Sequence, residues 1–271
     1  MKNIILITIK IPPLPMEVMK GCKSRGVGLY LGLPKEETLI AETLYVTDHE
    51  EIFRGLRQER ANVLVWLHEE NRDQDFSGAL YAIEKIEEAD YTYFERVYLR
   101  NMGLPWVIRE TKRCIIREMT EDDLEGIYYI YSGKSISAYI EALYEDPKEE
   151  REFIRSYIKN AYEFYGYGTW VIWHKESKQL IGRVGFNLRE GYEEPELGFV
   201  IAEEYQGQGY AAECCRAVME VGKKEYEFNR IQTLIKEGNI SSISLCKRLG
   251  FQYDKRVIWD KEEYLRFVME L

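Results

Sequence analysis

Apolar and polar residues alternate along the chain in two successive series of short segments. In the first series, apolar runs predict strands at residues 39–46, 63–67 and 79–83. Residues 47–50, Thr-Asp-His-Glu, form a capping signature that predicts a helix between the first two strands. Strand, helix and strand in this order indicate a small parallel α/β layer.

Further elements flank this layer in the sequence. We expect a helix at 16–25 and a strand at 28–32 before it, and a tyrosine-rich helix at 91–102 after it. The first fifteen residues contain a short apolar run that Lys10 and three prolines interrupt, without a cleavage site of small residues. This composition predicts an edge strand or a loose arm rather than a signal peptide.

A break separates the two series. Gly103 suits the end of a helix and Pro105 cannot continue one, so we expect a first domain at residues 1–108 and a second at 109–271. In the second series we expect strands at 114–118, 170–174, 180–187 and 195–202, and helices at 124–131 and 148–164. A helix, a strand, a helix and a terminal hairpin complete it.

Composition narrows the classes of protein to which the chain can belong. The 271 residues are 45 % hydrophobic and carry a formal net charge of −10, which argues against a general nucleic-acid binder. No apolar run approaches the roughly 20 residues that a membrane span needs. The five cysteines form neither a disulfide framework nor a zinc-ligand pattern. We therefore expect a cytoplasmic protein without a metal site.

The segment from Glu196 to Ala211 carries the strongest chemical signal. An apolar strand runs into a turn that contains Gly207 and Gly209, and then into a helix. These glycines let the backbone approach a ligand closely, and the helix start behind them favours an anion such as a diphosphate. A dinucleotide fingerprint would need a third glycine, which is missing, so the pattern argues against NAD as the ligand.

This segment resembles motif A of the GNAT acetyltransferase superfamily, Gln/Arg-x-x-Gly-x-Gly/Ala, which Gln206, Gly209 and Ala211 match. Residues 239–251, from Asn-Ile-Ser-Ser to Leu-Gly-Phe, resemble motif B. The resemblance covers residues 114–271 and is nearest to the ribosomal-protein N-terminal acetyltransferases. It implies an α/β (α+β) GNAT fold with a mixed, mostly antiparallel central sheet flanked by helices, preceded here by a small α/β Rossmann-like domain.

The resemblance also implies acetyl-CoA as the cofactor and a primary amine, on a peptide N-terminus or a small molecule, as the acceptor. The residues expected to bind the cofactor lie on the strand, on the turn and in motif B: Phe199, Val200, Ile201, Gln206, Gly207, Gln208, Gly209, Tyr210, Ala211, Asn239 and Ser242. For Asn239 an alternative interpretation stays open, because an asparagine there could simply cap the following helix.

The family mechanism is direct transfer, which needs a base for the amine and an acid for the leaving thiolate. Glu196 is the candidate base, with a solvated carboxylate at the strand end as the alternative. Cys246 fills the slot where many members carry a tyrosine acid, and it could be either a donor or a small buried side chain. Ser242, a bound water or Tyr253 could supply the proton instead.

The N-terminal domain resembles, faintly, a haloacid dehalogenase-like or other Rossmannoid domain. It lacks the Asp-x-Asp motif of an active phosphatase, since no aspartate precedes Asp48. We therefore interpret it as a module for docking, ligand sensing or homodimerisation, or as an unrelated layer packed on the transferase. For the whole chain, the alternative to an acetyltransferase is a non-catalytic protein that binds or senses acyl-CoA.

Overall fold

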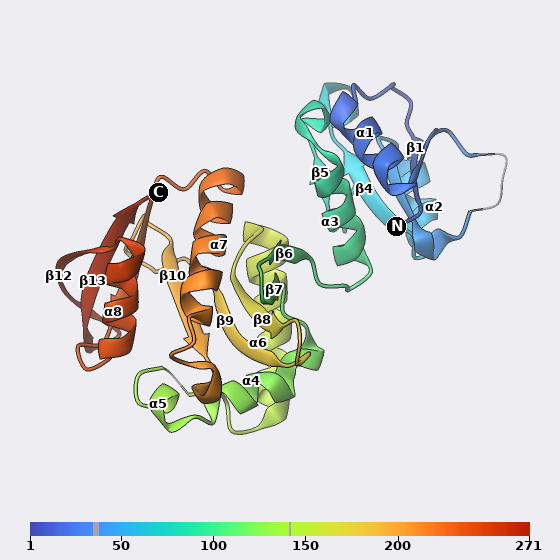
Figure 1. Cartoon of the computed structure of the whole chain (residues 1–271). Coiled ribbons are helices and arrows are strands. Elements are labelled where there is room, and N and C mark those ends of the chain that lie inside the picture. The colour runs from blue at the N-terminus through green and yellow to red at the C-terminus, as the bar shows by residue number, and fades with distance from the viewer. Residues whose placement is uncertain (35–37, 141) are drawn as a thin grey trace. The chain divides into compact units, whose positions relative to one another are not determined.

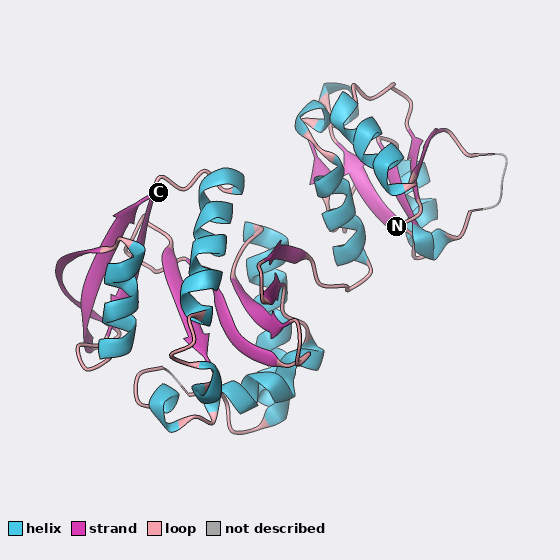
Figure 2. Cartoon of the chain, in the orientation of Figure 1, coloured by secondary structure: helices cyan, strands magenta, loops and turns pink. Residues whose placement is uncertain are grey.

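The computed structural model describes residues 1–34, 38–140 and 142–271. The chain divides into two compact units, Met1–Trp106 and Val107–Leu271, each with its own sheet and helices (Figure 1, Figure 2). We expected the division between residues 108 and 109. The division falls earlier because β6 (Val107–Glu110) pairs with β7 (Cys114–Arg117) in the second sheet. Across the described ranges, every helix is too short or too polar to cross a bilayer.

Five parallel strands form the sheet of the first unit, in the order β2-β1-β3-β4-β5. The strands are β1 (Asn3–Ile7), β2 (Gly28–Leu31), β3 (Thr43–Thr47), β4 (Asn62–Trp66) and β5 (Ala82–Ile83), and the helices are α1 (Met16–Arg25), α2 (Glu50–Gln58) and α3 (Tyr91–Asn101). Short 3₁₀ turns lie at Ile40–Glu42, Glu69–Asn71 and Ile86–Glu88. The expected parallel α/β layer is therefore present.

Helices cover both faces of this sheet. Leu44 and Leu64 belong to the apolar cluster that contains Phe94 of α3, whereas Val63 and Val65 pack with Phe53 of α2. Alternate residues of each strand thus enter different cores, as in a doubly wound sheet.

The prediction of an edge strand or loose arm at the N-terminus is wrong. β1 lies between β2 and β3, and Ile4 and Ile5 have no exposed surface. A central strand of a parallel sheet is buried on both faces, so it appears in the sequence as a continuous apolar run rather than as an alternating one. The prolines that suggested a loose arm lie beyond the strand, between β1 and α1.

Eight strands form the sheet of the second unit, in the order β12-β13-β11-β10-β9-β8-β7-β6. Its remaining strands are β8 (Thr169–His174), β9 (Leu180–Asn187), β10 (Glu196–Ile201), β11 (Arg230–Ile235), β12 (Gln252–Trp259) and β13 (Glu262–Glu270). Only β10 and β11 are parallel neighbours, and the other pairs are antiparallel. The expected mixed, mostly antiparallel sheet is confirmed.

The helices of this unit are α4 (Leu124–Tyr131), α5 (Lys134–Ser137), α6 (Pro147–Tyr157), α7 (Tyr210–Glu225) and α8 (Ile240–Leu249), with 3₁₀ turns at Glu121–Asp123 and Glu203–Tyr205. The long helix expected at 148–164 ends as an α-helix at Tyr157 and continues as a π-helix, Ile158–Tyr165. Residues of β9 alternate between helices: Arg183 bonds to Tyr131 of α4, and Phe186 touches Gly222 of α7.

Candidate functional site

The turn between β10 and α7 has a backbone that glycine makes possible. Gly207 and Gly209 adopt left-handed φ angles of 71° and 84°, a region that side chains with a Cβ seldom occupy. The side-chain amide of Gln206 donates to the carbonyl of Ile201 at 2.9 Å and braces the turn against the end of the strand. Gln206 therefore has a local structural role within the motif.

The amides of this turn are unused within the protein. In the described part of the chain, no protein acceptor pairs with the backbone N–H groups of residues 207–212. The residue before α7, Gly209, offers no side chain to cap the helix. Unpaired amides at a helix start carry a partial positive charge, so this end of the helix can bind an anion.

Two arginines add positive charge near these amides. Arg113 donates to the carbonyl of Gln208 at 3.0 Å, but Glu213 pairs with it at 2.7 Å and neutralises it. Arg248 of α8 lines the same cleft and forms no ion pair with a described residue. Neither arginine was predicted from the sequence, because each lies far along the chain from the turn.

A cleft opens directly beside the turn. Its narrow end has a volume of about 410 Å³ and its walls come from β10, the turn, the first residues of α7, and α8. Of the predicted cofactor residues, those in these walls are Phe199, Val200, Ile201, Gln206, Gly207, Gly209, Tyr210, Ala211, Asn239 and Ser242. Gln208 is not among them, since its side chain turns back to donate to the carbonyl of Glu204.

Diverging strands create the cleft. β10 and β11 are paired only at Glu196, the first residue of β10, and Gln232, the third residue of β11. Beyond this point both strands line the cleft, β10 through Phe199 and Val200 and β11 through Thr233 to Ile235. The edge of β10 that faces β11 therefore has free backbone groups. An extended ligand can form hydrogen bonds with this edge in the manner of an additional strand.

The cleft continues into a wide end with a volume of about 600 Å³. The two ends share a waist of six residues: Tyr139, Ile140, Phe199, Val200, Asn239 and Ser242. The wide end is lined largely by aromatic side chains from several elements: Tyr131, Tyr144, Phe153, Tyr157, Trp259 and Tyr264. A ligand anchored at the turn can thus reach a second chamber through the waist.

Glu196, the candidate base, lies in the wall of the wide end. It is only 4 % exposed and accepts two hydrogen bonds from the guanidinium of Arg189, one of them at 3.2 Å. Arg189 in turn lies 3.9 Å above the ring of Trp259. Glu196 is therefore a held, paired carboxylate rather than a solvated one at the end of a strand.

The residues of motif B lie at the waist. The side-chain oxygen of Asn239 accepts the amide of Ser242 at 3.1 Å, so Asn239 caps α8 and also lines both ends of the cleft. Both interpretations of this asparagine therefore agree with its position. The Ser242 hydroxyl forms no hydrogen bond within the described chain, which leaves it available to a ligand.

Cys246 has a different environment. It has no exposed surface and is not among the residues that line either end of the cleft. Burial raises the pKa of its thiol to about 12. The placement is that of a small buried side chain. Tyr253, another predicted alternative, is half exposed on β12, where it packs against Phe267.

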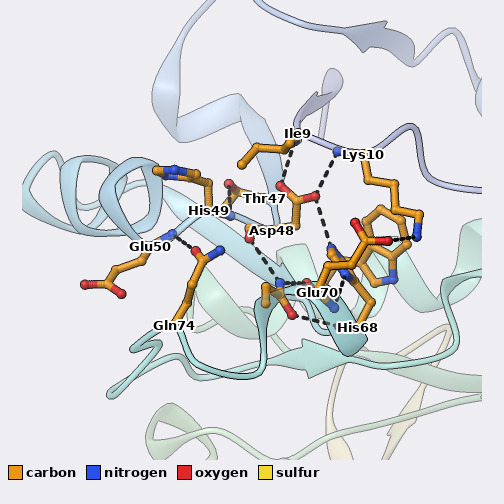
Figure 3. Close-up of polar contacts among 11 residues, drawn as sticks. Ile9, Lys10, Thr47, Asp48, His49, Glu50, His68, Glu70 and Gln74 are labelled. Atoms are coloured by element: carbon orange, nitrogen blue, oxygen red, sulfur yellow. Dashed lines mark hydrogen bonds and ion pairs between the residues drawn. The ribbon is translucent and has the colours of Figure 1, made fainter.

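The first unit contains a second group of polar residues at the carboxyl ends of its strands, drawn in Figure 3. Asp48, after β3, is 1 % exposed and accepts the amides of Ile9 and Lys10 at 2.8 and 3.1 Å. His68 reaches the same carboxylate at 3.3 Å, and Lys10 pairs with Glu70 at 2.8 Å (Figure 3). These groups satisfy one another, so the cluster anchors the loop after β1.

The fold and the cleft together define a class: an α/β domain with an open helix start and diverging strands beside a cleft that can accept an extended, anionic ligand. Comparison with known proteins agrees. The family model described as "Acetyltransferase (GNAT) domain" matches residues 113–252, just over half of the chain. The chain therefore belongs to the GNAT acetyltransferase family, whose members use acetyl-CoA.

Individual relatives match the same region. The uncharacterized N-acetyltransferase YoaA of Bacillus subtilis is 29 % identical over 148 residues, which are 54 % of this chain and 82 % of that protein. The spermine/spermidine N(1)-acetyltransferase of the same organism is 26 % identical over 55 % of this chain and 95 % of its own. A solved structure of a putative ribosomal-protein-serine acetyltransferase from Vibrio cholerae has a TM-score of 0.53 and 20 % identity, over 61 % of this chain and 98 % of its own.

Acetyl-CoA fits the residues that are present. The unpaired amides of residues 207–212 and the unpaired Arg248 suit its phosphates, and the free edge of β10 suits its extended pantetheine arm. The waist lies between this end of the cleft and the wide chamber. The prediction of acetyl-CoA as the cofactor is confirmed by the family, while the role of each residue stays a prediction.

Proposed function

We propose that the chain transfers the acetyl group of acetyl-CoA to a primary amine that enters the wide end of the cleft. One observation carries this proposal: the chamber beside Glu196 is joined, through the waist, to the turn with unpaired amides. A coenzyme site without an acceptor chamber would suit a sensor. The aromatic walls and the buried carboxylates of the chamber suit an organic amine, since ammonium groups bind well to both.

We infer that the transfer is direct, without an acyl-enzyme intermediate. A covalent route needs a nucleophile with a base beside it. All five cysteines are buried, and none of them lines the cleft. None of the three histidines lines it either, so Ser242 has no imidazole to activate it. Within the described chain, the cleft thus supports attack by the acceptor amine itself.

Glu196 is the base that we propose. An ammonium must lose a proton before it can attack, and a carboxylate in a desolvated wall can accept it directly or through one water. Arg189 fixes the orientation of Glu196, and the exposed part of Arg189 (27 % of its side chain) leaves it room to move away. An α-amine with a pKa near ~8 needs less assistance than a lysine near ~10.4.

Ser242 is the proton donor that we propose for the leaving group. Its hydroxyl is at the waist, where the two ends of the cleft meet, and it is not engaged elsewhere in the described chain. Bound acetyl-CoA supplies the activated acetyl group, and the chain supplies orientation, a base and a donor. Cys246 has no such access, so we propose no proton transfer for it.

Two measurements test the proposal on the purified full chain. Calorimetry with acetyl-CoA, and with NAD as the control, should show binding of acetyl-CoA alone. A thiol-release assay over polyamines, amino acids and peptides should then show turnover that requires both acetyl-CoA and an amine. Tight binding of acetyl-CoA without turnover of any amine would contradict the enzyme and leave a coenzyme-binding protein.

A further inference from the structure

Two charged side chains in the wide end of the cleft have no partner of opposite charge among the described residues. Four other charged residues of its walls or their neighbours are paired: Arg189 with Glu196, and Lys236 with Glu262 at 2.7 Å. Arg183 and Glu150 also line the wide end, yet within the described chain neither forms an ion pair. Both side chains are buried, with exposed fractions of 9 % and 2 %.

Arg183 is the less satisfied of the two. A guanidinium has five N–H donors, and only one hydrogen bond of Arg183 forms in the described chain, to the hydroxyl of Tyr131 at 3.2 Å. Its Nε is buried and has no partner. The ionisable groups that act on it most are tyrosines rather than carboxylates. A buried cation with unused donors is costly unless an anion completes it.

Position makes this arginine relevant to the ligand. Arg183 lies opposite Val200 in the pairing of β9 with β10, and side chains of directly opposite residues lie on the same face of a sheet. Val200 belongs to the waist of the cleft. The guanidinium therefore belongs to the wall of the acceptor chamber and not to the coenzyme end, whose walls do not include it.

Glu150 supplies the opposite charge from α6. One of its oxygens accepts the amide of Tyr144 at 3.0 Å, and the rest of the carboxylate has no cation among the described residues. A carboxylate in an aromatic chamber favours an ammonium group. The chamber thus presents one unpaired anion and one unpaired cation.

We propose that the acceptor is a small zwitterion, a primary amine that also carries a carboxylate, with Arg183 binding its carboxylate and Glu150 attracting its ammonium into the chamber, where Glu196 then accepts the proton. This inference rests on the proposed function. It favours amino acids and related amino carboxylates over polyamines, which carry only positive charge and would be repelled by Arg183. Arg183 and Glu150 are thus specificity-determining residues of the acceptor chamber.

Matched acceptors test the inference. Thiol release is measured with an aromatic amino acid, L-phenylalanine, with its carboxamide, which keeps the amine but loses the negative charge, and with spermidine. The wild-type chain should prefer the acid to the carboxamide in kcat/KM by at least about tenfold, because the site leaves buried donors unpaired with the carboxamide. Spermidine should be the poorest of the three.

Two variants of Arg183 and one control sharpen the test. Arg183→Met removes the charge at similar volume and should bring the ratio of acid to carboxamide close to one, while the Kd for acetyl-CoA stays unchanged. Arg183→Lys keeps the charge and should retain part of the preference. Arg256→Met, on the exposed hairpin and outside the cleft walls, changes the net charge equally and should leave the ratio unchanged.

Thermal unfolding separates this role from a structural one. If Arg183 serves to bind the acceptor rather than to stabilise the fold, Arg183→Met should unfold at the same or a higher temperature than the wild type. The substitution removes a buried charge that no described residue pairs with. A large fall in the melting temperature of Arg183→Met, with the ratio of acid to carboxamide unchanged in that variant, would assign Arg183 to the fold and overturn the inference.

The outcomes also distinguish the inference from the proposed function. Equal turnover of acid and carboxamide, or a preference for spermidine, overturns the zwitterion alone. Absence of turnover with every amine, while acetyl-CoA binds, overturns the proposed function and the inference with it.

Discussion

Two buried carboxylates, Asp48 in the first unit and Glu196 in the second, are held in different ways. Asp48 accepts hydrogen bonds from two backbone amides of the loop after β1 and contacts His68 (Figure 3). Groups of the protein itself therefore occupy its carboxylate oxygens. Among the described residues, Glu196 accepts hydrogen bonds only from the side chain of Arg189, and it borders a cleft. Side chains can move away for a ligand more easily than backbone can. The comparison shows that burial alone does not identify a reactive group.

The loops next to these carboxylates differ in whether their backbone amides already have acceptors within the protein. The loop after β1 has the amides of Ile9 and Lys10 bonded to Asp48, whereas no described residue accepts the backbone amides of residues 207–212 in the turn after β10. Both follow a buried parallel strand, where ligands commonly bind in α/β sheets. What distinguishes them is whether their polar groups are already satisfied. Variants of each carboxylate and each loop can break this comparison.

The largest effect is expected for Glu196→Gln. Loss of a general base lowers rates by about 10²–10⁴, so kcat for the best amine should fall in that range while the Kd for acetyl-CoA stays unchanged. Steady-state thiol release and calorimetry measure the two quantities. The control is Glu193→Gln, an exposed carboxylate of the same loop, which should keep the wild-type rate. A Glu196→Gln variant at full rate would remove Glu196 as the base.

Next in size is Gly207→Asp. Its Cβ would point into open space, so no packing is lost, but a carboxylate would face the bound diphosphate. Two like charges about 4 Å apart repel by ~4 kcal/mol near a protein surface, so the Kd for acetyl-CoA should rise at least about 100-fold. Gly191→Asp is a matched control, since Gly191 also has a left-handed φ and open space around its Cβ but is not in the cleft walls. Equal effects of the two variants on the Kd for acetyl-CoA would contradict binding of the diphosphate at this turn.

A smaller effect, on stability rather than on catalysis, is expected for Asp48→Ala. The amides of Ile9 and Lys10 lose their acceptor, which should lower the free energy of unfolding of the first unit by about 2 kcal/mol. Hydrogen exchange at these two amides and urea unfolding measure the change, and kcat for acetyl transfer should not change. Asp73→Ala, an exposed carboxylate, serves as the control. Loss of activity with unchanged stability would show that Asp48 acts in catalysis rather than in anchoring the loop after β1.

The smallest effect is expected for Cys246→Ala. Burial raises the pKa of this thiol to about 12, so it stays protonated and inaccessible at neutral pH. We expect kcat/KM to stay within about twofold of the wild type and stability to fall by about 1 kcal/mol. Native Cys246 should also resist iodoacetamide at pH 7 to 9, because only the thiolate reacts and desolvation disfavours it. A tenfold loss of kcat would instead support Cys246 as the proton donor to the leaving thiolate.

The sequence by itself determined most elements of this protein and the turn between β10 and α7 that contains Gly207 and Gly209. Local patterns carry that information: the helix Met16–Arg25, the helix Leu124–Tyr131 and the strand Leu180–Asn187 have the bounds that were predicted. The turn at Gly207 and Gly209 could also be predicted from the sequence, because a left-handed backbone strongly favours glycine at these positions.

Only the tertiary structure decided which side chains meet. The central place of β1, the pairing of Arg189 with Glu196, the burial of Cys246 and the unpaired state of Arg183 depend on contacts between segments that the chain brings together on folding. Hydrophobic periodicity reports which face of an element is buried, but not against which partner. Charge pairing and desolvation act over a few ångströms in space, so no spacing along the chain reveals them.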